Sequence, residues 1–159
     1  MNIIHLLFSK LGRYRLILDR RTGADYMHRY YLFLKDRQKF PFNFVLHKIV
    51  KSDDPIFHDH PWGYLTIILC GGYWEHTPVF DKDGAIVSET RKWRGPGSII
   101  KRSANDYHWL ELDNGKPVTT LFFMGNQERE WGFLIEDMSK YKWVTHNEYL
   151  SNWQHYKVS

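Results

Sequence analysis

The sequence predicts an all-β domain whose architecture is a β-sandwich, a jelly roll or a closed barrel. Short runs of β-branched and aromatic residues recur from about residue 43 to residue 137. Gly, Pro, Asp and Asn separate these runs at the spacing of antiparallel strands, and no helical pattern lies between them. Because 43% of the 159 residues are hydrophobic, the chain has enough apolar material for one domain with a core of its own.

Eight strands are expected in this β-core, and turn motifs connect some of them into hairpins. DKDG at 81–84, GPG at 95–97 and LDNG at 112–115 each provide a glycine where positive φ is expected. The periodicity does not choose among a sandwich, a jelly roll and a barrel. The expected strands are Asn43–Val50, Tyr64–Cys70, Tyr73–Thr77, Ile86–Trp93, Ser98–Lys101, Tyr107–Leu112, Val118–Met124 and Trp131–Ile135.

The two ends of the chain are expected to belong to the same single domain, which spans residues 1–159. Aromatic residues in Asp25–Phe40 fit either a helix face or a strand that packs on the β-core. Near the other end, Thr145 is a suitable N-cap for a short helix that runs through Leu150. The prediction is therefore a β-core at about 43–137 with an N-terminal extension and a short C-terminal helix.

Charge, hydropathy and cysteine content exclude several classes of protein. The 22 basic and 18 acidic side chains leave a net charge of +4, spread along the chain, which does not favour nucleic acid as a partner. No apolar run approaches the roughly 20 residues of a membrane helix. The N-terminal apolar run lacks a preceding positive residue, so no secretory signal is expected. Cys70 is expected to be a small residue of the core. Because it is the single cysteine, a disulfide framework is excluded and a reducing, cytoplasmic setting is expected.

The segment FHDHPW contains two histidines, His58 and His60, that are separated by one residue. If this segment is extended, both imidazoles project from the same face and can bind one metal ion. Neutral imidazole is a common ligand of zinc, iron, copper and nickel. The chain has nine histidines, so an accidental HxH in a polar loop is the competing interpretation.

This segment also resembles the first motif of the cupin superfamily, which reads HxH, three or four residues, Glu, six residues, Gly. Both histidines match the motif, and the glycine pair at 71–72 lies where it requires glycine. The position of the glutamate falls on Tyr64 or Leu65, and neither side chain has a carboxylate. The acidic metal ligand of the motif is therefore absent from its usual position in the sequence.

A second, separate segment resembles the second cupin motif, which reads Gly, five residues, Pro, one residue, Gly, two residues, His, three residues, Asn. Gly97 and His108 match its register. Ser103, Asn105 and Leu112 replace the proline, the second glycine and the asparagine. Asparagine tolerates the left-handed backbone conformation that a turn glycine supplies, so the turn is retained.

The resemblance covers roughly residues 43–123 and implies a cupin-type double-stranded β-helix. It implies that His58, His60 and His108 bind a divalent transition metal, with iron expected first and zinc, nickel or manganese as alternatives. Such a site is similar to the three-histidine centres of the cysteine-dioxygenase-like cupins, in which ferrous iron activates oxygen. HDHPW, GGYWE and REWGF together are also similar to uncharacterised cupins of phage and bacterial genomes.

Three polar residues are expected near these histidines. Asp59 alternates to the opposite face, so a hydrogen bond within the loop or behind the ligands is expected for it. Glu75 follows the glycine pair and is a candidate fourth ligand, with a solvated surface residue as the competing interpretation. His47 shares one strand face with Asn43, Val45 and Ile49, where it could act as an acid or base or bind an anion. A hydrogen-bonded structural role competes for His47.

Tyrosines and arginines in the β-core are further candidates for the site. Tyr64 and Tyr107 join His47 as candidate catalytic residues. Arg94, Arg102 and Tyr64 are candidate substrate-binding residues, because cupin-type barrels surround the metal with aromatic and basic side chains when the substrate carries a carboxylate. Packing or surface roles are the competing interpretation for all of them.

Three functions remain open from the sequence. The first is a metal-dependent oxygenase that acts on a small polar molecule. The second is a metal-independent isomerase or epimerase of the nucleotide-sugar type, with His60 or His108 as the base and a tyrosine as the acid. The third is a non-catalytic module that binds a small ligand or takes part in an interaction. A homodimer is also expected, supported by the aromatic-rich N-terminal segment.

Overall fold

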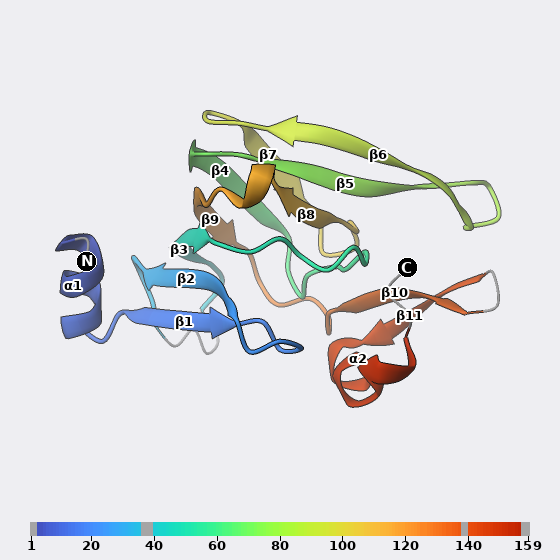
Figure 1. Cartoon of the computed structure of the whole chain (residues 1–159), viewed down its shortest axis with the longest axis horizontal. Coiled ribbons are helices and arrows are strands. Elements are labelled where there is room, and N and C mark those ends of the chain that lie inside the picture. The colour runs from blue at the N-terminus through green and yellow to red at the C-terminus, as the bar shows by residue number, and fades with distance from the viewer. Residues whose placement is uncertain (1–2, 36–39, 138–139, 157–159) are drawn as a thin grey trace.

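The computed structural model describes residues 3–35, 40–137 and 140–156, most of which form antiparallel strands (Figure 1). The described helices are α1 (Ile3–Lys10), α2 (His146–Asn152) and two short 3-10 helices, η1 (Asp113–Gly115) and η2 (Trp153–His155). None of them is long and apolar enough to span a membrane. The strands are β1 (Tyr14–Leu18), β2 (Asp25–Tyr31), β3 (Asn43–Ile49), β4 (Tyr64–Cys70), β5 (Tyr73–Phe80), β6 (Ile86–Arg94), β7 (Ile99–Arg102), β8 (Trp109–Leu112), β9 (Val118–Met124), β10 (Gly132–Asp137) and β11 (Lys140–Thr145).

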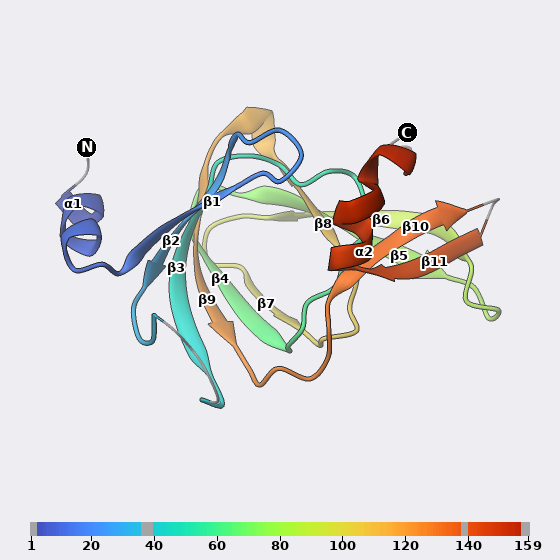
Figure 2. The ribbon, with the colours of Figure 1, turned by 90° about the horizontal axis from the view of Figure 1, so that it is seen from below.

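Two sheets enclose the main core, as the all-β prediction requires. The larger sheet has the strand order β1-β2-β3-β9-β4-β7, and the smaller has the order β6-β5-β8. The larger sheet is strongly curved in Figure 2. Buried side chains from both sheets form one cluster, which includes Ile49 and Ile68 from the larger sheet and Tyr73 and Leu110 from the smaller. The two sheets therefore face each other across a shared core.

Strand β3 lies in the middle of this arrangement and confirms the predicted alternation. Its inward residues Asn43, Val45, His47 and Ile49 are all buried. His47 is paired across the ladder with Arg29 of β2 on one side and with Thr120 of β9 on the other. Because directly paired residues point to the same face of a sheet, these three polar side chains form one row on the inner face.

The N-terminal part of the chain belongs to the larger sheet. The described part of Asp25–Phe40 supplies strand β2, and residues 36–39 lie outside the described residues. Strand β1 was not expected at all, because its residues are half-buried or exposed without a regular alternation. The sheet thus extends beyond the expected limit at residue 43, because β2 pairs directly with β3.

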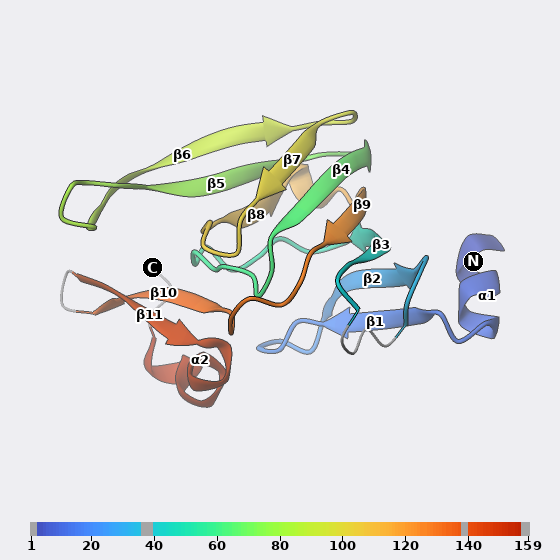
Figure 3. The same cartoon turned by 180° about the vertical axis from the view of Figure 1, so that it is seen from behind.

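The C-terminal residues form a hairpin and a helix that pack together at one end of the molecule (Figure 3). Ile135, Val144 and Tyr149 make a small core cluster there. Helix α2 begins as predicted, because the hydroxyl of Thr145 accepts a hydrogen bond from the backbone amide of Glu148 at 3.2 Å. Strand β11 was not expected.

Most of the expected strands and turns are confirmed, with differences of a few residues at their ends. One glycine of each of the three turn motifs has positive φ, as predicted, namely Gly84, Gly97 and Gly115. The expectation for Cys70 was wrong, because its side chain is exposed. The pairing of β4 with β9 shifts register between Ile68 and Cys70. This irregularity ends the alternation that would have placed the cysteine in the core.

Candidate metal centre

The two segments that carry the predicted ligands are joined by backbone hydrogen bonds. The amide of His58 donates to the carbonyl of His108, and the amide of His108 donates to the carbonyl of His58, each at 3.0 Å. His58 also forms a β-bridge with Phe133, the second residue of β10. HxH therefore lies on a short extended segment between the chain at His108 and the start of β10. The bridge between His58 and His108 brings residues 50 positions apart into contact.

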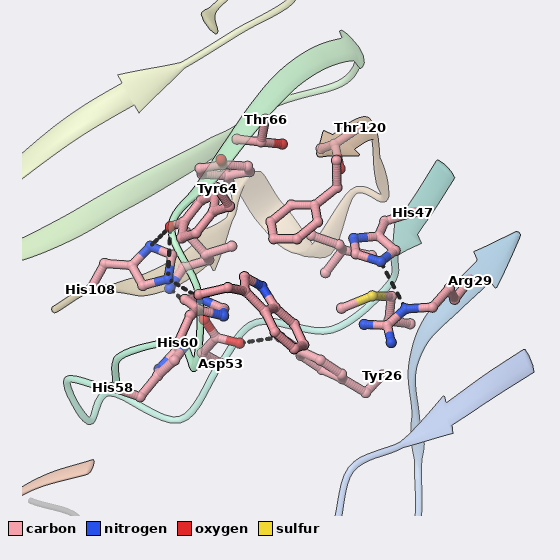
Figure 4. A pocket seen from close by; sticks show the side chains of 16 residues that line it. Tyr26, Arg29, His47, Asp53, His58, His60, Tyr64, Thr66, His108 and Thr120 are labelled. Carbon is pink, nitrogen blue, oxygen red and sulfur yellow. Dashed lines mark hydrogen bonds between the residues drawn. The ribbon is translucent and has the colours of Figure 1, made fainter. Parts of the chain in front are cut away.

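Three imidazole rings converge at this point (Figure 4). One ring nitrogen from each of His58, His60 and His108 lies within 4.8 Å of the other two. The Nε2 atoms of His60 and His108 are 2.9 Å apart. Two nitrogens bound at right angles to one metal, with bonds of about 2.1 Å, are separated by about 3.0 Å. The donor type and the spacing of this pair therefore fit a shared transition-metal ion.

Burial sets the protonation of His58 and His60. It lowers the pKa of His58 to about 4 and is the largest cause of that shift. Burial also lowers the pKa of His60 well below its ordinary value, and the neighbouring His108 and His58 lower it further. Both side chains are therefore neutral at pH 7. Neutral imidazole is the form that binds a metal, so the two rings need not lose a proton first.

Glu75 lies directly behind His108. Its side chain is only 1% exposed, and one carboxylate oxygen is 3.4 Å from Nδ1 of His108. Arg94 and Arg102 form ion pairs with the same carboxylate at 2.7 and 2.8 Å. Burial alone would raise the pKa of Glu75, but the hydrogen bond and charge of His108 and the two arginines outweigh it and lower the pKa to about 2. The solvated-surface interpretation of Glu75 was therefore wrong, and the cluster of three ligand nitrogens does not include its carboxylate.

The three histidines line one side of a pocket of about 90 Å³. Tyr64 also lines it, with its hydroxyl 3.3 Å from Nε2 of His108, and burial raises the pKa of this phenol well above its ordinary value. His47 lines the pocket from β3 and is 4% exposed, so it points into the barrel as expected. Apolar residues such as Leu110 and Phe122 complete the wall.

Three other candidate residues are not among those that line the pocket. Tyr107 immediately precedes His108 on an extended segment and lies beside Phe80, with a ring distance of 6.2 Å. Successive residues of an extended chain point to opposite faces, which explains why Tyr107 does not accompany His108. Arg94 and Arg102 bind Glu75 instead of lining the pocket.

Arg29 lines the pocket from β2 and was not among the predicted site residues. Its Nε donates a hydrogen bond to Nε2 of His47 at 2.9 Å. Strand β2 alternates so that Met27, Arg29 and Tyr31 share the inner face. An arginine between two large apolar residues at every second position indicates a charged side chain on the inner face of a strand. This pattern can be recognised only when the segment is known to be a strand.

Asp59 holds the HxH segment against the C-terminal hairpin. Its side chain is fully buried and accepts hydrogen bonds from the amide of Gly132 at 2.6 Å and from Nε1 of Trp143 at 2.9 Å. Arg129 forms an ion pair with it at 3.3 Å. The expectation that Asp59 points away from the ligands and makes hydrogen bonds is confirmed. Its carboxylate fixes the backbone between the two histidines.

Comparison with known proteins supports the fold. No family model and no curated protein matches the sequence. Among solved structures, the chain is similar to the polyketide cyclase RemF from Streptomyces resistomycificus, with a TM-score of 0.57, 15% identity, and coverage of 80% of this chain and 84% of the cyclase. It is also similar to the DMSP lyase DddQ from Ruegeria pomeroyi, with a TM-score of 0.55 and 17% identity over 80% of this chain and 63% of the lyase. A cupin-like protein from Thermotoga maritima matches with a TM-score of 0.51 and 14% identity, over 79% of this chain and 83% of that one. With two facing antiparallel sheets and a cluster of three histidines inside, the chain has the cupin fold.

Proposed function

We propose that the chain is a metal-dependent oxygenase that acts on a small polar molecule. The observation that carries this proposal is the convergence of His58, His60 and His108 at the wall of a pocket, with their ligand nitrogens within 4.8 Å of one another. Imidazoles bind a metal in their neutral form, so three of them would leave the charge of a divalent cation uncompensated. When bound, ferrous iron would supply a redox-active Lewis acid with open positions for further ligands.

The protein's own residues would orient a molecule bound at this centre. Tyr64 keeps its proton because its pKa is raised by burial, so its hydroxyl can donate a hydrogen bond to a ligand beside His108. Phe122 stacks on the Tyr64 ring with the two centroids 4.9 Å apart, which restricts the movement of that ring. The small size of the pocket limits the space left for water around the bound molecule.

A metal-independent isomerase or epimerase is the second candidate, and one contact favours it. The hydroxyl of Tyr64 and the imidazole of His108 lie 3.3 Å apart, which is the proximity that a tyrosine acid and a histidine base require. This function needs no metal. Metal content therefore separates the two candidates.

The test is a metal titration of the purified full-length chain after treatment with a chelator. We expect about one Fe²⁺ per chain by elemental analysis, and loss of this metal in the His58→Ala and His60→Ala variants. His28→Ala is the matched control, because His28 lies on β2 outside the pocket and contacts Tyr14. Folded wild-type protein that takes up no Fe²⁺, Zn²⁺, Ni²⁺ or Mn²⁺ would refute the proposal and favour the second candidate.

The oxygenase part of the proposal can be tested without a known substrate. Nitric oxide is a probe for an open coordination position on ferrous iron. The iron-loaded protein is expected to give the electron paramagnetic resonance signal of a ferrous nitrosyl complex. Iron that is bound stoichiometrically but gives no such signal would indicate a closed, structural site and would refute oxygen chemistry here.

We also propose that the chain is a homodimer. The outer face of the larger sheet carries an apolar row that crosses four strands, because Leu121 pairs with both Leu46 and Ile67, and Ile67 pairs with Ile99. Ile99 is 65% exposed. A second copy that covers this face would remove the row from water. Sedimentation equilibrium should show a dimer in the wild type and a monomer in Ile99→Lys, and a wild-type monomer would refute this proposal.

A further inference from the structure

One wall of the pocket carries a positive charge that faces the three histidines. Arg29 and His47 lie on neighbouring strands at one side of the pocket, and His58, His60 and His108 lie at the other side (Figure 4). The Arg29 guanidinium is half-buried, and its Nε is held by Nε2 of His47 at 2.9 Å. Since this His47 nitrogen accepts the bond, the Nε–H of the arginine is already used. The Tyr31 side chain also hydrogen-bonds to the guanidinium, and the remaining N–H donors can bind another partner.

The charge of Arg29 has no counterion within the described part of the chain. None of the ion pairs there includes Arg29. Asp53 is the acidic residue that lines the pocket, and its carboxylate accepts hydrogen bonds from the Tyr26 hydroxyl and from the amide of Leu110 at 2.8 Å. The acid in the pocket is therefore bound to other groups.

The surroundings of Arg29 increase the cost of leaving this charge unpaired. Arg15 is directly opposite it in the β1–β2 ladder, so a second guanidinium extends from the same face. Burial lowers the pKa of Arg29, the contact with Tyr31 offsets part of this shift, and Arg15 adds repulsion between like charges. His47 contributes no negative charge, because burial holds its pKa well below the ordinary value and keeps it neutral. A buried cation without a partner is unfavourable unless a ligand supplies the opposite charge.

We propose that Arg29 binds the carboxylate of a small organic anion whose other end reaches the three-histidine centre. This inference rests on the proposed function and names the class of its substrate. The two Nη groups of a guanidinium match the two oxygens of a carboxylate, which gives two charge-assisted hydrogen bonds with a fixed orientation. A pocket of about 90 Å³ holds a molecule of only a few heavy atoms between the two walls. The sequence-derived assignment of substrate binding to Arg94 and Arg102 is thereby replaced, because both bind Glu75 and neither lines the pocket.

The experiment uses the full-length chain after removal of metal, so that it does not depend on the metal centre. Acetate and propionate are the anionic probes, and acetamide is the neutral probe of similar shape. Nuclear magnetic resonance follows the imidazole signal of His47 during each titration. We expect saturable shifts with both anions and none with acetamide.

Two variants and one control connect the binding to Arg29. Arg29→Gln should weaken acetate binding by about tenfold or more, because both charge-assisted hydrogen bonds are lost. Arg29→Lys keeps the charge and should bind acetate with intermediate affinity, which also guards against a folding defect in the glutamine variant. Lys48→Gln removes the same charge from an exposed neighbour of His47 that points to the outer face of β3, and it should change affinity by less than about twofold.

The outcomes separate this inference from the proposed function. Unchanged acetate binding in Arg29→Gln, or no saturable acetate binding to the wild type, would overturn the anion site even if the metal binds. Arg29→Gln should still take up one metal ion per chain, because Arg29 is not among the three clustered ligands. Loss of metal from His58→Ala together with retained acetate binding would support both proposals.

Discussion

The Nδ1 atom of His108 lies 3.4 Å from a carboxylate oxygen of Glu75, while the Nε2 atom of the same ring faces Nε2 of His60 at 2.9 Å. A carboxylate beside Nδ1 requires the proton to be on that nitrogen, which leaves the lone pair of Nε2 directed at the centre. Arg94 and Arg102 hold the carboxylate in place. Glu75 thus fixes the tautomer and orientation of a proposed ligand without being a ligand itself.

Replacing Glu75 by Gln is expected to weaken metal binding by about 10- to 100-fold, because the amide no longer favours the required His108 tautomer. The variant also leaves Arg94 and Arg102 without a countercharge and should lose about 3–5 kcal/mol of unfolding free energy. Metal titration and urea unfolding measure the two effects. Glu111→Gln is the control for metal binding, because Glu111 lies on β8 outside the pocket and binds Arg91 and His76. Metal affinity that is equal in both variants would contradict the role assigned to Glu75.

Asp59→Asn tests the attachment of the HxH segment. The amide oxygen can accept only part of the hydrogen bonding from Gly132 and Trp143, and the amide nitrogen faces donors. We expect a loss of about 1–3 kcal/mol in urea unfolding and weaker metal binding, since the backbone between His58 and His60 becomes less fixed. Asp83→Asn, in an exposed turn, should change neither quantity. A fully stable Asp59→Asn protein would show that the hairpin does not position the ligands.

The spacing of HxH pointed to His58 and His60 as a pair, whereas His108 was named only because its segment resembles the second cupin motif. The structure joins the two segments through the bridge between His58 and His108. The charged residues were harder to place. Periodicity places Arg102 and Arg29 on strand faces, but it does not reveal their partners. Arg102 pairs with Glu75, whereas Arg29 has no carboxylate partner among the described residues and bonds to His47.

Strand β1 was missed for a different physical reason, whereas a strand was one of the two alternatives for the segment that forms β2. Strand β1 lies at the edge of its sheet and is buried on neither face, so its hydrophobic pattern has no clear period of two. It pairs with the next strand, β2, which in turn pairs with β3. The strand preference of such an edge depends on how its side chains pack on their neighbours, and it leaves little trace in a local pattern.

The stability of the chain is expected to decrease as the pH falls from about 4 to 2, in part through Asp19. Burial alone would raise the pKa of Asp19, but hydrogen bonds from Lys51 and from the amides of Thr22 and Arg21 lower it from 3.8 to about 2. Because the folded-state pKa is the lower one, the stabilisation is complete above the unfolded-state pKa and is lost on acidification. The partly exposed pair with Lys51 contributes roughly 1–2 kcal/mol.

Urea unfolding of the wild type and of Asp19→Asn at several pH values measures this contribution. The difference in unfolding free energy should be largest near pH 7, should fall steeply below pH 4 and should approach zero only below pH 2. Lys51→Gln removes one of the hydrogen bonds to the carboxylate and should reduce the same difference. A difference between wild type and Asp19→Asn that does not change with pH would refute the assignment.

Gly71→Ala tests the tight turn that joins β4, which carries Tyr64, to β5, which carries Glu75. Gly71 has a φ of +74°, and a Cβ atom there would lie 2.6 Å from the carbonyl oxygen of Pro117. The contact is with backbone, so it cannot be relieved by rotating a side chain. We expect a loss of about 2–4 kcal/mol of unfolding free energy from the strained φ and the clash together. Gly84→Ala has a similar φ of +82° but no atom within 4 Å of the added Cβ, so it should lose only about 1–2 kcal/mol. Urea unfolding measures both losses. Equal losses would show that the positive φ alone determines the cost. The close approach of Gly71 to Pro117 would then not constrain the strands that carry Tyr64 and Glu75.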